Sequence, residues 1–161
     1  MRALTLALFL VGCTPWTEFP DVDGPASSDY VVPGAFDGTA VLELRAYAGP
    51  VLVKREVCTT PISLAVNATA EQLVSGTLVC NFEEVGTVSA DLMGSGAPLP
   101  WLEGTLDGDE IVATWTGWFT DEVTLYADTI GTTRAQGLRI EYRGYVQAER
   151  TGPLPGGSIG G

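Results

Sequence analysis

Three cysteines, Cys13, Cys58 and Cys80, carry the most distinctive chemistry in this sequence of 161 residues. A thiol can act as a nucleophile, bind a metal ion or form a disulfide. The chain contains no histidine, so it lacks the usual general base, the Ser–His and Cys–His nucleophile pairs and the commonest zinc ligand. We therefore predict a protein that is not an enzyme and that uses no metal and no cofactor.

The acidic residues do not change this prediction. The turns at 107–109 and 121–122 each hold two carboxylates, but a strand of about ten residues places them about 30 Å apart, too far for one paired-carboxylate site. Eight basic residues stand against twenty acidic ones, for a net charge of -12. Such a chain repels a phosphate backbone, which argues against nucleic acid as a partner.

The amino terminus has the features of an export signal. Arg2 precedes an apolar run from Ala3 to Val11, and the small residue Gly12 follows. This run is too short to cross a bilayer, which takes about 20 apolar residues. The pattern predicts a signal peptide over residues 1–12.

The residues Leu10-Val11-Gly12-Cys13 resemble the lipobox of bacterial lipoproteins. The resemblance implies that the Cys13 thiol is joined to diacylglycerol, that the chain is cut before it, and that the new amino terminus receives a fatty acid such as palmitate. It also implies a lipid-anchored protein of the bacterial cell envelope whose partner is membrane lipid. Thr14, where an Asp favours inner-membrane retention, favours the outer membrane.

Composition divides the mature chain into three parts. Residues 13–34 contain four prolines and four acids and no base after the cysteine, which predicts an extended acidic spacer that lifts the domain off the bilayer. Residues 35–149 form the predicted β domain. Residues 150–161 make a Gly/Pro tail that we predict to be disordered.

The β domain shows short runs of alternating apolar and polar residues, separated by turn residues. The pattern predicts an all-β antiparallel meander of eight or nine strands that closes into a small barrel, with a β-sandwich as the alternative. Its outline resembles a lipocalin barrel in architecture alone. One region breaks the pattern: an odd-numbered inward face at 51–57 meets an even-numbered one at Cys58, which predicts a bulge at that junction.

Two alternating runs flank a turn near Thr69 and predict a disulfide. In the predicted register, paired residue numbers sum to 138, so Leu64 lies opposite Val74 and Cys58 opposite Cys80. Opposed Cα atoms lie about 4.5 to 5.5 Å apart, within reach of a disulfide. Export to an oxidising compartment favours the same pairing.

Aromatic residues on the inward faces are the candidate ligand contacts. Trp115, Phe119 and Tyr142 could line a pocket for an apolar molecule, or they could simply fill the core. The sequence thus predicts a non-catalytic binding or structural domain with a protein partner or a small apolar ligand, and the alternative is a lipocalin-like carrier. An interior cavity of several hundred Å³ would favour the carrier.

Overall fold

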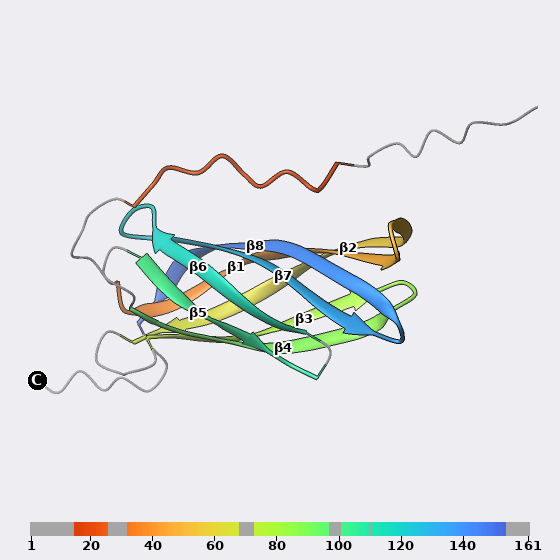
Figure 1. The fold of residues 1–161 in the computed structure, drawn as a ribbon. Coiled ribbons are helices and arrows are strands. Elements are labelled where there is room, and N and C mark those ends of the chain that lie inside the picture. The colour runs from red at the N-terminus through yellow and green to blue at the C-terminus, as the bar shows by residue number, and fades with distance from the viewer. Residues whose placement is uncertain (1–14, 26–31, 68–72, 97–100, 110, 154–161) are drawn as a thin grey trace, which may run out of the picture.

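The computed structural model describes residues 15–25, 32–67, 73–96, 101–109 and 111–153. Within these residues eight antiparallel strands pair in sequence order and close into a barrel, β1 beside β8 (Figure 1). The strands are β1 (Gly34–Ala48), β2 (Val51–Val66), β3 (Val74–Phe82), β4 (Gly86–Gly96), β5 (Trp101–Asp107), β6 (Val112–Phe119), β7 (Thr124–Ala135) and β8 (Leu138–Gly152). The prediction of a closed meander is confirmed, and the sandwich alternative is excluded.

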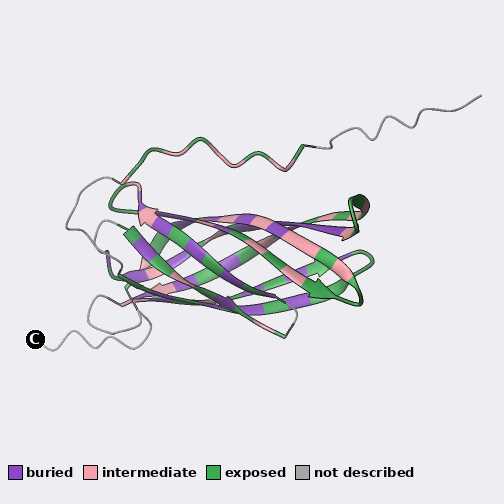
Figure 2. Cartoon of the chain, in the orientation of Figure 1, coloured by how far each residue is buried: buried purple, intermediate pink, exposed green. Residues whose placement is uncertain are grey.

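Alternation along the strands builds the core. Buried and exposed residues follow one another in most strands (Figure 2), because successive side chains of a strand point to opposite faces of the sheet. The alternation predicts one inward residue in every two, and except for the half-buried Gly76 these residues are buried in β3, β4 and β6: Val74, Leu78, Cys80, Phe82, Val88, Ala90, Leu92, Ala113, Trp115, Gly117 and Phe119. The same alternation places Val123 on the inward face, but Val123 is 50% exposed because it precedes β7 in a turn. No helix in the described ranges has the length and apolar character needed to cross a membrane.

The prediction for the first part of β2 is wrong. The ladder with β1 shifts register between Ala46 and Tyr47, whose partners are Lys54 and Leu52. One extra residue of β2 therefore bulges at Val53, and the even-numbered face continues from there to the end of the strand. The odd-numbered valines of this part are not buried in the core, since they are 45 to 55% exposed: Val51, Val53 and Val57.

The disulfide between Cys58 and Cys80 is confirmed, with Cα atoms 5.7 Å apart. The predicted register between the two strands is off by two residues, because Leu64 lies opposite Gly76. A shift of two keeps every side chain on the same face of the sheet, so both cysteines still face the core. They are 4% and 0% exposed.

Residues 15–25 depart from the predicted spacer. They run along the outer face of the barrel (Figure 1) and contact β1, β6 and β8. We call this segment the strap. Proline and acid content predicted a solvated chain, but Trp16, Thr17 and Phe19 find partners on the barrel wall. The predicted signal peptide and Cys13 lie outside the described residues, as do residues 154–161 of the predicted tail. Residues 150–152, which the sequence pattern assigns to that tail, belong to β8, which pairs with β1.

Candidate binding site

A cavity of about 520 Å³ opens at one end of the barrel. This end, which we call the open end, carries the connections β1–β2, β3–β4, β5–β6 and β7–β8. The cavity is lined by Leu42, Leu44, Ala46, Val53, Lys54, Phe82, Glu84, Val85, Val88, Asp109, Ile111, Thr133, Arg134, Ala135, Gln136, Leu138, Ile140 and Tyr142. Its volume lies within the range of small-molecule sites.

The cavity has apolar walls and a charged mouth. Leu44, Phe82, Val88 and Ile111 are buried in its walls. The charged residues that line it come from or beside the connecting turns: Lys54, Glu84, Asp109 and Arg134. An apolar body could lie against the walls while a polar group remains at the mouth, which is the arrangement expected for an amphipathic ligand.

Tyr142 and Leu42 form the floor of the cavity. The Tyr142 ring lies over Gly131, where a Cβ atom would come within 2.1 Å of the ring. Its hydroxyl donates a hydrogen bond to the Val112 carbonyl, so a buried polar group is satisfied. Burial raises the pKa of this phenol.

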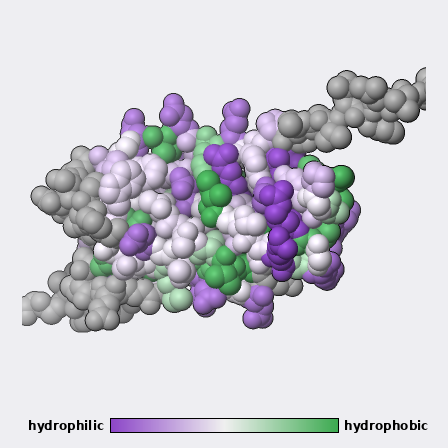
Figure 3. Space-filling model, viewed as in Figure 1, coloured by the Kyte–Doolittle hydropathy of each residue, from purple (hydrophilic) through white to green (hydrophobic). Residues whose placement is uncertain are grey.

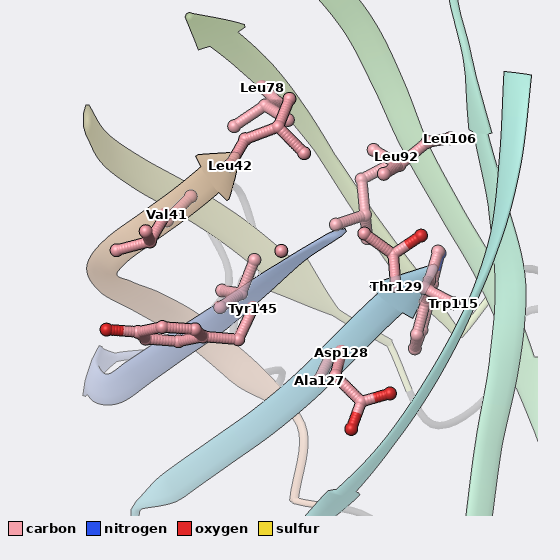
Figure 4. Close-up of a pocket in the computed structure, with 13 residues that line it drawn as sticks. Val41, Leu42, Leu78, Leu92, Leu106, Trp115, Ala127, Asp128, Thr129 and Tyr145 are labelled. Carbon is pink, nitrogen blue, oxygen red and sulfur yellow. The ribbon is translucent and has the colours of Figure 1, made fainter. Parts of the chain in front are cut away.

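Below this floor the barrel is filled. Trp115 lies across the backbone of β4 and β5, where glycines leave room for its ring; a Cβ atom at Gly94 would lie 2.1 Å from it. The indole Nε1 donates a hydrogen bond to the Met93 carbonyl at 3.2 Å. The void beside Trp115 holds only about 20 Å³. Figure 4 shows leucine side chains and Trp115 converging there, while Tyr145 and Asp128 project away.

The three predicted ligand residues therefore have different positions. Tyr142 lines the cavity. Trp115 borders only the small void, and Phe119 packs on Phe36 with ring centroids 5.9 Å apart. Sequence reasoning missed Lys54, Glu84 and Arg134. These residues could have been found from the sequence because each lies in or near a turn, and alternate turns of an eight-stranded meander meet at the same end of the barrel.

One side wall of the cavity has few backbone hydrogen bonds. The ladder between β2 and β3 comprises three residue pairs and stops at Leu64 and Gly76. Nearer the open end, the disulfide bridges the strands. Beyond it, Lys54 pairs with Glu84 at 2.9 Å, a hydrogen bond that raises the pKa of the Lys54 ammonium. We call this wall the seam.

The strap covers a buried charge cluster on the outside of β1. Glu43 is 1% exposed and accepts hydrogen bonds from Nε of Arg45 at 2.6 Å and Nε of Arg55 at 2.8 Å. The Thr17 amide and hydroxyl each donate to its other oxygen at 2.6 Å. Burial alone would raise the pKa of Glu43, but the hydrogen bonds from Arg55, Thr17 and Arg45 outweigh it and lower the pKa to about 2.

An aromatic group continues the strap contacts toward the other end. Tyr126 packs between Trp118 and Tyr145, with ring centroids 4.8 and 6.4 Å away. Burial, reinforced by the nearby Asp128 carboxylate, raises the pKa of Tyr126 to about 12. Trp118, which the sequence places on the outward face, donates a hydrogen bond from its indole to the Asp23 carbonyl at 2.9 Å. The outer aromatic surface is thus used by the chain's own amino-terminal segment.

Comparison with known proteins identifies no family for this chain. No family model matches it, and no curated protein matches it. The solved structure of YwiB from Bacillus subtilis aligns over 73% of this chain and 93% of its own, with 6% identity and a TM-score of 0.35. A likeness this weak supports no argument about function.

Proposed function

We propose that this protein is a lipid-anchored binding protein of the bacterial cell envelope whose barrel holds a small apolar or amphipathic molecule at its open end. The cavity of about 520 Å³ carries the binding part of the proposal. A purely structural barrel of eight strands is just wide enough to be filled by its own side chains. Here the lower part is filled and the open end is not, which favours the carrier alternative.

The anchor rests on Leu10-Val11-Gly12-Cys13, with the outer membrane favoured by Thr14. The Cys58–Cys80 disulfide supports export, because such bonds persist in oxidising compartments. It also leaves Cys13 as the one cysteine of the sequence outside the bridge. Mass spectrometry of the amino-terminal peptide of the native protein tests the anchor: acylated Cys13 is expected, and an uncleaved Met1 would contradict it.

Ligand binding is tested with a fluorescent fatty acid and the chain from Thr14 onward, which keeps the strap and all strands. We expect saturable binding of one probe per chain. Ala46→Trp places an indole in the cavity and is expected to weaken binding at least tenfold, because it occupies volume that the probe needs. Fluorescence titration measures both.

Ala48→Trp is the matched control for this experiment. Ala48 lies in the same strand, is exposed and does not line the cavity, so binding should remain within about twofold. Thermal unfolding of both variants checks that the barrel is intact. An absence of saturable binding to the unsubstituted chain would remove the carrier function and leave a structural or protein-binding role.

A further inference from the structure

The strap begins at the open end of the barrel. The Pro15 carbonyl accepts a hydrogen bond from Arg45, and the Arg45 guanidinium lies over the Trp16 ring at 4.0 Å from its centroid. Arg45 is three residues from the end of β1, at the β1–β2 connection. Figure 1 shows the strap running from there along the outside of the barrel toward the opposite end.

The strap is held along its length. Thr17 binds Glu43, and Phe19 packs edge-on against Tyr145 with centroids 5.8 Å apart. The Arg143 guanidinium covers the same Phe19 ring at 3.9 Å. Near its end, the Asp23 carbonyl accepts the hydrogen bond from Trp118. A segment with contacts at both ends and in the middle keeps one position relative to the barrel axis.

The proposed anchor leaves very little free chain before the strap. Two residues of extended chain span at most about 7 Å, which is the greatest separation between Cys13 and Pro15. A tether of this length cannot lift the barrel off the membrane. Acyl chains at Cys13 would instead bring Arg45, and the open end beside it, to the level of the lipid headgroups.

The exposed side chains of the open end suit a lipid surface. Val51 and Val53 of the β1–β2 hairpin are 55% and 52% exposed, and Val85 of the β3–β4 turn is 37% exposed. In Figure 3 hydrophobic and hydrophilic side chains both reach the surface at this end, on the right. These exposed valines, surrounded by charged side chains of both signs, suit the surface of a zwitterionic bilayer, where apolar groups insert beneath the headgroups.

We infer that the strap fixes the barrel with its open end docked on the bilayer, so that the cavity faces the membrane and takes its ligand from the lipid phase. This inference rests on the proposed Cys13 anchor. It narrows the ligand of the proposed function to a molecule that is dissolved in the bilayer.

Fluorescence quenching by lipid tests the orientation. An environment-sensitive fluorophore is attached through Val51→Cys at the open end or through Val123→Cys at the opposite end. The two sites are similarly exposed, at 55% and 50%. The full lipidated protein is placed in phosphatidylcholine vesicles that contain brominated phosphatidylcholine. Quenching of the label at position 51 is expected to exceed that at position 123 at least threefold.

A strap variant provides the control. Trp16→Ala with Thr17→Ala removes the indole under Arg45 and the hydroxyl hydrogen bond to Glu43. The backbone hydrogen bonds of Pro15 and Thr17 remain, but we expect the weakened end of the strap to detach, so that the barrel turns on a longer free tether. Quenching at position 51 should fall to the level at position 123, while vesicle flotation is unchanged. A difference between the two sites that survives in this variant would overturn the role of the strap.

The remaining outcomes distinguish the docked orientation from the anchor and from the carrier function. Equal quenching at both sites, with mass spectrometry showing acylated Cys13, overturns docking and leaves the anchored carrier intact. A strong difference without fatty-acid probe binding supports docking and removes the carrier function. An unmodified Cys13 overturns both the anchor and the docked orientation.

Discussion

Glu43→Gln is expected to detach the strap and to lower the free energy of unfolding by about 3 kcal/mol. The substitution keeps the shape of the side chain and removes its charge. Arg45, 4% exposed, and Arg55 then face each other without their shared carboxylate. Removing one partner from a buried ion pair is costly because the remaining charge stays desolvated. Chemical denaturation measures the loss, and hydrogen exchange at Thr17 reports the strap.

Glu141→Gln is the matched control for this variant. Glu141 lies on β8 directly opposite Arg45 and pairs with Arg139, but the pair is exposed to solvent. Exposed ion pairs contribute about 0 to 1 kcal/mol, so this identical change of charge should cost less than about 1 kcal/mol. Equal losses in the free energy of unfolding would show that the buried cluster under the strap contributes no more to stability than an exposed ion pair.

The pH dependence of the Glu43→Gln difference is a second measurement of the same contact. The folded-state pKa of Glu43 is about 2, below its ordinary value of 4.5. A depressed pKa stabilises the folded protein fully above the ordinary value, and the contribution is lost as pH falls toward the folded pKa. The gap between the parent protein and Glu43→Gln should therefore be constant above about pH 5 and shrink between pH 4.5 and 2.

The inward residues of β3, β4 and β6 could be predicted because a strand's side-chain period depends only on its own residues. The disulfide could be predicted for the same reason, because the period places both cysteines on the inward face. The hairpin register was wrong by two residues, yet Cys58 and Cys80 stayed on one face and met diagonally, not directly opposite each other. The error at Val53 has the opposite origin, since a bulge is set by how β1 and β2 pair, which neither strand's own pattern contains.

The strap and the cavity could not be predicted because both depend on contacts distant in sequence. Glu43 and Arg45 alternate with buried leucines, a pattern typical of a solvated strand face. Nothing local indicates that Thr17, 26 residues away, covers them. The cavity depends on whether inward side chains reach across the barrel. Trp115 does so where glycines face it, whereas Ala46 leaves the open end unfilled.

Reduction of the Cys58–Cys80 disulfide is expected to lower the free energy of unfolding by about 3 kcal/mol. The bond closes a loop with a sequence separation of 22, and a loop of this size restricts the unfolded chain by roughly that amount in the chain-entropy model. It also joins β2 to β3 where their ladder has stopped. Denaturant unfolding of the oxidised and reduced protein measures the difference without altering any core side chain other than the two cysteines.

The position of the bond predicts where the reduced protein opens. Without it, the seam toward the open end depends on two exposed contacts of Glu84, whose carboxylate pairs with Lys54 and whose amide donates a hydrogen bond to Glu56. Exposed contacts of this kind are weak. Amide exchange should therefore accelerate in the short ladder between β2 and β3, at residues 64–66 and 74–76, while β1 amides paired with β8 stay protected. The variant Cys58→Ala with Cys80→Ala serves as control, since reductant should leave its stability unchanged. Reduction without loss of stability in the parent protein would show that the contacts of Glu84 and the three-pair ladder hold the seam by themselves.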